Sequence, residues 1–214
     1  MTIGVPKLLT YIGLLVGAFG LVLQFAISIP AYLAAGRWLP DALVTFFSYY
    51  TILTNIALAL IYLSQVTTIG WLRPFRSPVI RAMMVAVMVL VAGFYHFLLA
   101  DLWEPQGLFR IADVTLHYMT PALYIVWWFF AHRHGELGYT DIPAMLLPTL
   151  VYFLWVLTRG AVVGEYPYPV LAANELGYGA VVVNALFIAA FLAVAAMLVI
   201  AIDRLLAGRQ AIAE

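Results

Sequence analysis

The chain has 214 residues, of which 66% are hydrophobic and 9% charged, whereas soluble domains are roughly 45–50% apolar and about 25% charged. This composition excludes an ordinary soluble globular domain, and the balance of ten basic against ten acidic residues argues against nucleic acid as a partner. The absence of cysteine excludes a disulfide framework, thiolate metal sites and a cysteine nucleophile.

Six apolar runs divide the chain, and each suits a helix of about 20 residues that crosses a bilayer. In chain order they cover approximately residues 8–29, 42–65, 82–101, 112–131, 142–159 and 179–202. Solidly apolar runs favour helices over barrel strands, which would alternate polar and apolar residues. We therefore expect an all-α polytopic membrane protein, a six-transmembrane-helix bundle that forms a single domain over residues 1–214.

The basic residues of the predicted loops are distributed unevenly between the two sides of the membrane. Seven lie on one side and three on the other, namely Lys7, Arg73, Arg76, Arg81, Arg133, Arg204 and Arg209 against Arg37, Arg110 and Arg159. Because the more basic side normally faces the cytoplasm, we expect both termini there and the chain in the cell (inner) membrane. Five tryptophans near span ends are expected to anchor in the headgroup layer: Trp38, Trp71, Trp103, Trp127 and Trp128.

The predicted span 42–65 carries the most polar stretch inside any of the apolar runs. Thr51, Thr54 and Asn55 are spaced i, i+3, i+4, so they share one face of a helix. Hydroxyl and amide groups of this kind commonly bond the carbonyl of their own helix or join two helices together. The spacing alone therefore leaves a structural and a chemical interpretation open.

The predicted span 112–131 carries His117, with Asp113 one helical turn before it. A carboxylate at this position is suited to fix the tautomer of the imidazole and to stabilise its cation. Pro121 lies four residues after His117 and lacks the N–H that would bond the carbonyl of residue 117, which predicts a distortion beside the histidine. Thr51 and His117 are both expected in the outer half of the membrane.

Three further histidines and one arginine complete the set of ionisable candidates. His96 lies near the outer end of span 82–101, whereas His132 and His134 lie in a predicted cytoplasmic loop and are expected to be solvated. Arg159 lies at the outer end of span 142–159, followed by a loop with two Tyr-Pro pairs that is suited to cap a site.

These segments resemble a bacterial group of six-span membrane proteins over essentially the whole chain. The resemblance lies in Tyr50-Thr51-Ile52-Leu53-Thr54-Asn55, Trp103-Glu104-Pro105-Gln106-Gly107, Leu116-His117-Tyr118 with Pro121, and Arg159-Gly160 followed by Tyr166-Pro167-Tyr168-Pro169. Spans two to four are also similar to the eukaryotic androgen-induced and androgen-dependent transmembrane proteins, which are threonine hydrolases of fatty acid esters of hydroxy fatty acids. Their pattern combines a span-two threonine in a Tyr-x-Thr-x-x-Asn context with a span-four histidine.

The resemblance implies an intramembrane lipid hydrolase that cleaves fatty-acyl esters of the branched type and needs no cofactor or metal. Thr51 matches the nucleophile and His117 the general base, with Asp113 orienting the imidazole. Thr54 occupies the position expected for the asparagine, and Asn55 comes one residue later, so Thr54 is a rival nucleophile. A histidine that precedes the catalytic one in the family is replaced here by Thr115 or Val114.

The substrate that this reading implies is a membrane lipid or fatty-acid ester. Five residues are expected to bind it: Asn55, Thr54, His96, Tyr118 and Arg159. Asn55, His96 and Tyr118 are candidates for stabilising an oxyanion, and Arg159, together with Arg110, for meeting a free carboxylate.

Two other classes of function remain open at this point. His96 and His117 on neighbouring spans could be axial ligands of a haem, or could hold a divalent ion with Asp101 and Asp113, in a membrane electron-transfer protein. A small-molecule carrier would need a polar path across the whole bilayer, and the cytoplasmic halves of the spans offer few polar side chains for one.

Overall fold

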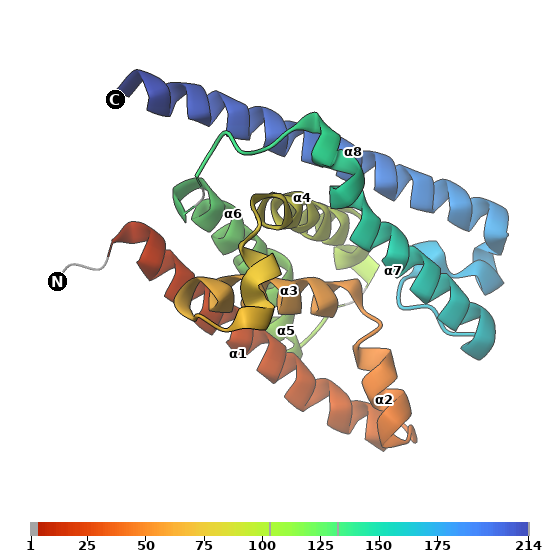
Figure 1. Cartoon of the computed structure of the whole chain (residues 1–214). Coiled ribbons are helices and arrows are strands. Elements are labelled where there is room, and N and C mark those ends of the chain that lie inside the picture. Colours follow the sequence, from red (N-terminus) through yellow and green to blue (C-terminus); the bar gives the residue numbers. More distant parts are fainter. Residues whose placement is uncertain (1–3, 103, 132, 214) are drawn as a thin grey trace.

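The computed structural model describes residues 4–102, 104–131 and 133–213, and these contain helices and connecting loops but no strand. Trp103 and His132, for which the sequence predicts an interfacial anchor and a solvated side chain, lie outside the described residues. The beginning of the first helix and the end of the last one lie at the same end of the molecule (Figure 1).

The described residues form eight α-helices, which follow one another in the order of the predicted spans. They are α1 (Val5–Ala34), α2 (Leu39–Phe46), α3 (Tyr50–Val66), α4 (Pro78–Phe94), α5 (Leu108–Val114), α6 (Thr120–Ala131), α7 (Ile142–Val163) and α8 (Ala173–Ala213). The short elements between them are η1 (Gly70–Arg76), η3 (Ala100–Leu102), η5 (Tyr139–Asp141) and η6 (Pro169–Leu171), which are 3-10 helices, and η2 (Tyr95–Leu99) and η4 (Thr115–Met119), which are π turns.

Four helical stretches among the described residues are long and apolar enough to cross a membrane, as expected of a multi-pass membrane protein. They are Val5–Ala34, Pro78–Leu102, Tyr139–Val163 and Ala173–Gly208, and α2 with α3 makes a fifth if the bent pair counts as one span. The remaining predicted span, the fourth in chain order at 112–131, falls in the helical run of α5, η4 and α6, which is not among these candidates.

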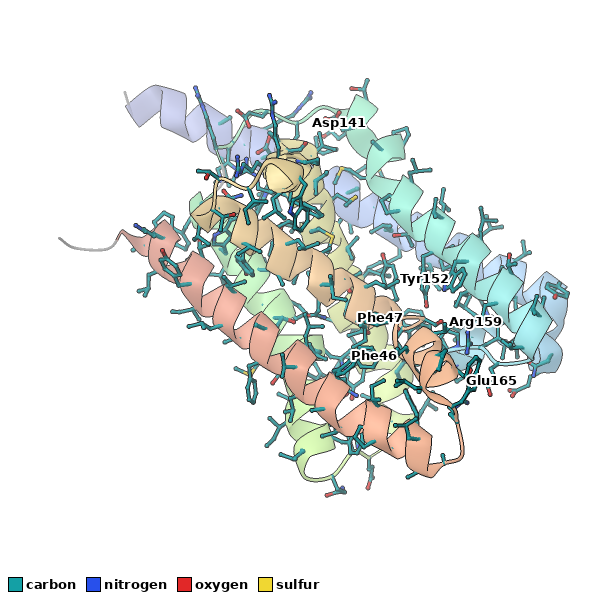
Figure 2. The ribbon with its side chains drawn as sticks, turned by 60° about the horizontal axis from the view of Figure 1, so that its bottom comes forward. Phe46, Phe47, Asp141, Tyr152, Arg159 and Glu165 are labelled. Carbon is teal, nitrogen blue, oxygen red and sulfur yellow. The ribbon has the colours of Figure 1, made fainter. Side chains whose placement is uncertain are left out.

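The predicted span 42–65 is not one continuous helix, because α2 and α3 meet at an angle of 74°. Ser48 lies in the break, where its hydroxyl bonds the carbonyl of Val44 at 2.7 Å and its own carbonyl accepts a hydrogen bond from the Tyr152 hydroxyl at 2.9 Å. Figure 2 shows Tyr152 on α7 and, next to the break, Phe46 and Phe47 at the end of α2. Serine is a poor helix former when its hydroxyl bonds the backbone, and successive aromatic residues are also unfavourable in a helix. The hydrogen bond from Tyr152 of α7 then fixes the break at Ser48.

The helix that carries His117 is distorted where the sequence predicts it. Thr115–Met119 forms a π turn, directly before Pro121 enters α6. A second π turn, Tyr95–Leu99, faces it from the end of α4. Single π turns inside helices occur often at functional sites, because each inserts an extra residue and rotates the side chains that follow.

Glycines on α1 let this helix approach its neighbours closely. A Cβ atom on Gly20 would lie 2.8 Å from Thr115 Cγ2 and 2.9 Å from Leu116 Cδ2, and one on Gly13 would overlap the ring of Tyr62. Small residues at helix contacts are the usual means of close packing in membrane bundles. As a result α1 lies directly against the π turn that holds His117.

Two predictions about side-chain environment are wrong. Trp127 and Trp128 are not interfacial anchors but fully buried, and the Trp127 indole N–H donates to Thr10 Oγ1 at 2.8 Å. His134 is not solvated either. It is buried against α8, where its Nδ1 lies 3.1 Å from Asp203 Oδ1, while Asp203 Oδ2 accepts backbone N–H groups of the same loop. The loop folds back because a buried carboxylate needs these donors.

Candidate active site

Thr51 and His117 meet inside the bundle, as their predicted depths suggest. Thr51 Oγ1 lies 3.2 Å from His117 Nε2, and the two residues are 66 positions apart in the chain. Thr51 is buried and His117 half-buried, at 18% exposure of its side chain. α3 supplies the hydroxyl from its first turn, and the π turn η4 supplies the imidazole. We refer to these two side chains as the Thr51–His117 pair.

The other ring nitrogen of His117 faces Asp113. Nδ1 lies at hydrogen-bonding distance, 3.0 Å, from the carbonyl oxygen of Asp113, and also 3.0 Å from its carboxylate oxygen Oδ1, which is buried and has no hydrogen bond of its own. Because both neighbours are hydrogen-bond acceptors, Nδ1 carries the proton, and the lone pair of Nε2 points at the threonine hydroxyl. This is the tautomer that a general base needs.

Tyr95 and Arg110 also contact Asp113, and Tyr95 contacts the imidazole of His117 as well. The Tyr95 hydroxyl donates to Asp113 Oδ2 at 2.6 Å, and Arg110 lies 3.6 Å from the same oxygen. The Tyr95 ring stacks on His117 with a centroid distance of 3.9 Å and an angle of 15° between the ring planes. The carboxylate oxygen Oδ2 therefore has a hydrogen bond and a neighbouring cation, and the stacked ring of Tyr95 restricts the orientation of the imidazole.

Thr54, the rival nucleophile, is turned away from the pair. Its hydroxyl donates to the carbonyl of Tyr50 at 2.8 Å and lies 3.2 Å from that of Thr51. Thr51 is the second residue of α3, so four residues before it lies Phe47 in the break rather than a helical carbonyl. The start of the helix thus frees one hydroxyl and leaves the other bonded to its own backbone.

Asn55, a predicted binding residue, is fully buried and joins α3 to the helix of His117. Its amide nitrogen donates to the carbonyls of Thr51 and Leu116 at 2.8 and 3.2 Å, and its oxygen accepts from the Thr120 hydroxyl at 2.5 Å. Because these bonds occupy the amide, Asn55 positions the two helices and has no donor left to offer a substrate.

His96 and Tyr118 form a separate pair away from the site. His96 is exposed, and its Nδ1 lies 3.1 Å from the Tyr118 hydroxyl. Neither residue lines the cavities beside Thr51 and His117. Each of the two directly follows an inward-facing side chain, Tyr95 or His117, and successive residues of a helix point to different faces.

A donor that sequence reasoning missed is the backbone N–H of Thr51 itself. As an N–H in the first turn of α3 it has no partner within the helix, and it donates to the hydroxyl of Tyr168 at 3.4 Å. Tyr168 lies in the loop between α7 and α8, outside the helical stretches that could cross a membrane. Burial raises the pKa of the Tyr168 phenol, which therefore stays a protonated donor at neutral pH.

The loop that carries Tyr168 is fixed at several points. The Tyr166 ring lies directly on Gly160 of α7, where a Cβ atom would be 2.0 Å from it, and the Asn184 amide of α8 donates to the carbonyl of Val170 at 2.8 Å. Glu165 pairs with Arg37 at 2.8 Å. The tight turn that these contacts need at Gly164 has a positive φ of 75°, which glycine adopts readily.

Arg159 lies at the base of this loop and away from the Thr51–His117 pair. Its guanidinium donates to Thr45 Oγ1 at 3.0 Å and to the carbonyl of Glu165 at 3.1 Å, and Figure 2 shows Arg159 and Glu165 beside α2. Its buried Nε has no hydrogen-bond partner. Arg159 and Arg37 line a cavity of about 460 Å³, which we call the polar cavity. Arg110, the other arginine predicted to meet a carboxylate, does not line it.

Two more cavities flank the Thr51–His117 pair. The apolar cavity has a volume of about 50 Å³ and lies among α3, α4, α7 and α8, whereas the mixed cavity has about 450 Å³ and extends from the pair to α1 and the α7–α8 loop. Thr51, His117, Tyr95 and Tyr168 line both of them. The side chains of Thr51 and His117 therefore lie between the apolar cavity and the mixed cavity and line both of them.

The described residues contain no group of three or more His, Asp or Glu side chains placed to hold a metal ion. For the haem hypothesis, His117 uses one ring nitrogen toward Thr51 and the other toward Asp113, and His96 bonds Tyr118. The predicted ligands thus belong to two different hydrogen-bonding groups.

No protein-family model, curated protein or solved structure matches the chain.

Proposed function

We propose that the protein is an intramembrane hydrolase of lipid acyl esters that uses Thr51 as its nucleophile and His117 as its general base. The observation that carries this proposal is the 3.2 Å contact between Thr51 Oγ1 and a His117 nitrogen whose partner nitrogen faces Asp113. A hydroxyl, an imidazole and an aspartate in this order of contacts resemble a catalytic triad, with Asp113 offering both its backbone carbonyl and its carboxylate to Nδ1. The resemblance to the threonine hydrolases supports the same assignment.

In the first half of the reaction, Thr51 Oγ attacks the ester carbonyl carbon while His117 Nε2 accepts the hydroxyl proton. Asp113 stabilises the imidazolium that forms. The tetrahedral intermediate then collapses, the bond to the alcohol oxygen breaks, and His117 returns its proton to that oxygen. The products are an acyl ester on Thr51 and a free alcohol.

The negatively charged oxygen of the tetrahedral intermediate would lie near two hydrogen-bond donors. The Thr51 N–H and the Tyr168 hydroxyl lie next to the attacking oxygen, and the N–H is at the positive end of α3. A nucleophile that contributes its own backbone N–H to the oxyanion hole is known from serine proteases. In this step the oxyanion replaces the Tyr168 hydroxyl as acceptor of the Thr51 N–H.

In the second half, a water molecule replaces the alcohol and repeats the chemistry. His117 takes a proton from the water as it attacks the acyl carbon, and the bond to Thr51 Oγ breaks as that oxygen regains the proton. The released acid and the regenerated threonine complete the cycle. The mixed cavity supplies the water, since it contains both His117 and Asp113.

We also propose that the chain crosses the cell membrane six times with both termini in the cytoplasm. α5, η4 and α6 form an uninterrupted helical run over residues 108–131, and Leu108–Ala131 would complete an even number of crossings. An even number agrees with the beginning of α1 and the end of α8 lying at the same end of the molecule (Figure 1). Arg110 and Asp113 lower the hydropathy of this helix, and they are the groups that the proposed chemistry needs near His117.

The proposal is tested by labelling the purified protein with a fluorophosphonate, which reacts with activated hydroxyl nucleophiles. We expect labelling of the wild type, its loss in Thr51→Ala and His117→Ala, and its retention in Thr54→Ala. Thr54→Ala is the matched control, because its hydroxyl lies one turn further along α3 and is bonded to its own backbone. Undiminished labelling of Thr51→Ala would contradict the assignment.

A further inference from the structure

The two cavities beside the Thr51–His117 pair differ in the polar groups that they offer. In the apolar cavity, the Tyr50 hydroxyl and Thr149 Oγ1 bond each other at 2.6 Å, and the Tyr152 hydroxyl is bonded to a backbone carbonyl. The other residues that line only this cavity are aliphatic or phenylalanine side chains, such as Leu90, Phe153 and Ile188. Because its hydroxyls are already paired, this cavity favours a hydrocarbon group over a polar one.

The mixed cavity, in contrast, has polar groups along its length and a polar far end. Gln24 and Ser28 of α1 line it together with Asp113. At its outer end it shares the side chains of Tyr32, Tyr49, Pro167 and Pro169 with the polar cavity, where Arg37, Arg159, Glu165 and Glu175 lie. This cavity is therefore suited to a group that combines apolar and polar parts.

The order of the reaction distinguishes the two sides of an ester. The alcohol must take a proton from His117, leave, and be replaced by water at the same place, whereas the acyl group stays bound to Thr51 until the second step. The side with room for water and with Asp113 is the mixed cavity. The side that can retain a hydrocarbon chain without water is the apolar cavity.

We infer that the apolar cavity binds the acyl chain and that the mixed cavity binds an alcohol carrying a polar end group, an assignment that rests on the proposed function. The apolar cavity measures about 50 Å³ and the mixed cavity about 450 Å³, so the apolar cavity suits the smaller of the two groups. Esters with short acyl chains on an amphiphilic alcohol are the preferred substrate class. Ile188 of α8 lies on the wall that limits longer chains.

The test compares two ester series on the purified protein in detergent. One series holds the alcohol constant as 4-methylumbelliferone and lengthens the acyl chain from butyryl to dodecanoyl. The other holds the acyl group as butyryl and lengthens an alkanol, with released butyrate measured by gas chromatography. The variants are Ile188→Ala and Phe153→Leu in the apolar cavity, and Phe109→Ala, which lines only the mixed cavity, as the matched control.

We expect the wild type to hydrolyse butyryl faster than dodecanoyl esters, and Ile188→Ala to raise the relative rate on dodecanoyl by about tenfold. Phe153→Leu should shift the preference in the same direction, which guards against one variant failing to fold. Phe109→Ala should leave the acyl preference unchanged and alter the alcohol series.

The outcomes separate the inference from the function on which it rests. Suppose that hydrolysis depends on Thr51, but that the acyl preference changes in Phe109→Ala and not in the apolar-cavity variants. This result would reverse the assignment of the two cavities and would leave the proposed hydrolase function standing. Equal wild-type rates on short and long acyl chains would overturn the size limit. Failure of every ester to be hydrolysed, together with no labelling of Thr51, would overturn the proposed function and the inference with it.

Discussion

Side chains of the same type have different environments at neighbouring positions of this site. Thr51 and Thr54 are one helical turn apart, yet only Thr51 has its hydroxyl 3.2 Å from an imidazole, because the hydroxyl of Thr54 bonds the carbonyl of Tyr50. The difference arises from where α3 begins. Both residues are threonines with the same hydroxyl group. The position of each relative to the start of the helix decides whether that hydroxyl is bonded to a backbone carbonyl or available to the imidazole.

Tyr168→Phe tests the second oxyanion donor. Removing the hydroxyl takes one hydrogen bond from the charged intermediate, so we expect kcat to fall by about 10²–10³-fold with a smaller change in KM. The control is Tyr166→Phe in the same loop, because Tyr166 does not line the cavities beside the Thr51–His117 pair. Steady-state hydrolysis of a butyryl ester measures both. An unchanged kcat in Tyr168→Phe would leave the Thr51 N–H as the only donor.

Asp113→Asn tests the orientation of the imidazole. An amide can present its nitrogen to Nδ1 and favour the wrong tautomer of His117, so we expect kcat to fall by about 10⁴-fold, as in serine proteases. The contact to Tyr95 gives a structural control, since its hydroxyl can still bond the amide oxygen. Near wild-type kcat in Asp113→Asn, measured with the same ester, would mean that the backbone carbonyl of residue 113 alone sets the tautomer.

At the level of the elements, the site depends on how closely α1 approaches the π turn η4. Gly20→Ala would place a methyl group 2.8 Å from Thr115, so we expect η4 to shift, esterase activity to fall at least about tenfold and stability to drop by about 1–3 kcal/mol. Gly17→Ala is the matched control on the same helix, because a Cβ atom there meets nothing within 4 Å. Equal activity of the two variants, with equal thermal unfolding midpoints, would show that the close contact does not hold the imidazole.

Much of the site could be predicted at the level of elements from local spacing. One helical turn separates Asp113 from His117, and Pro121 follows at the distance that removes a helical hydrogen bond, so the carboxylate contact and the distortion follow from the sequence. The break between α2 and α3 could not be predicted, because it depends on a hydrogen bond from Tyr152, 104 residues away from Ser48.

Other features were missed for the same reason. Tyr168 reaches Thr51 because the loop packs on Gly160 and α8, and loop paths of this kind are set by tertiary contacts rather than by local propensity. The two Tyr-Pro pairs and Gly160 were signals for a structured cap, but not for which tyrosine points inward. The burial of Trp127 and His134 likewise depends on partners in α1 and α8.

At the level of the whole molecule, the proposed topology gives the bundle an outer and a cytoplasmic side. Figure 2 shows Asp141 at one end of α7 and Arg159 near the other, so the two ends of this helix mark the two sides of the bundle. In the proposed topology the α7–α8 loop, the polar cavity and the Thr51–His117 pair belong to the outer half. A lipid in the outer leaflet would then reach the site without crossing the membrane.

Single cysteines test this topology without background, because the chain contains none. We expect Ala35→Cys and Gln106→Cys to react with a membrane-impermeant maleimide on intact cells, and Thr68→Cys and Glu136→Cys to react only after lysis. The reverse pattern would invert the orientation. Labelling of Gln106→Cys and Glu136→Cys from the same side would show that the run 108–131 does not cross.

The break before α3 has a consequence for how such a protein can change. If the second span resumed its helix one turn later, the hydroxyl of Thr54 would be released from its intrahelical acceptor, and that of Thr51 would no longer lie in a first turn. The reactive group would then move along the chain without any mutation at either threonine. In the proposed mechanism, substitutions at Ser48 or at its distant partner Tyr152 would therefore affect which of the two threonines acts as the nucleophile.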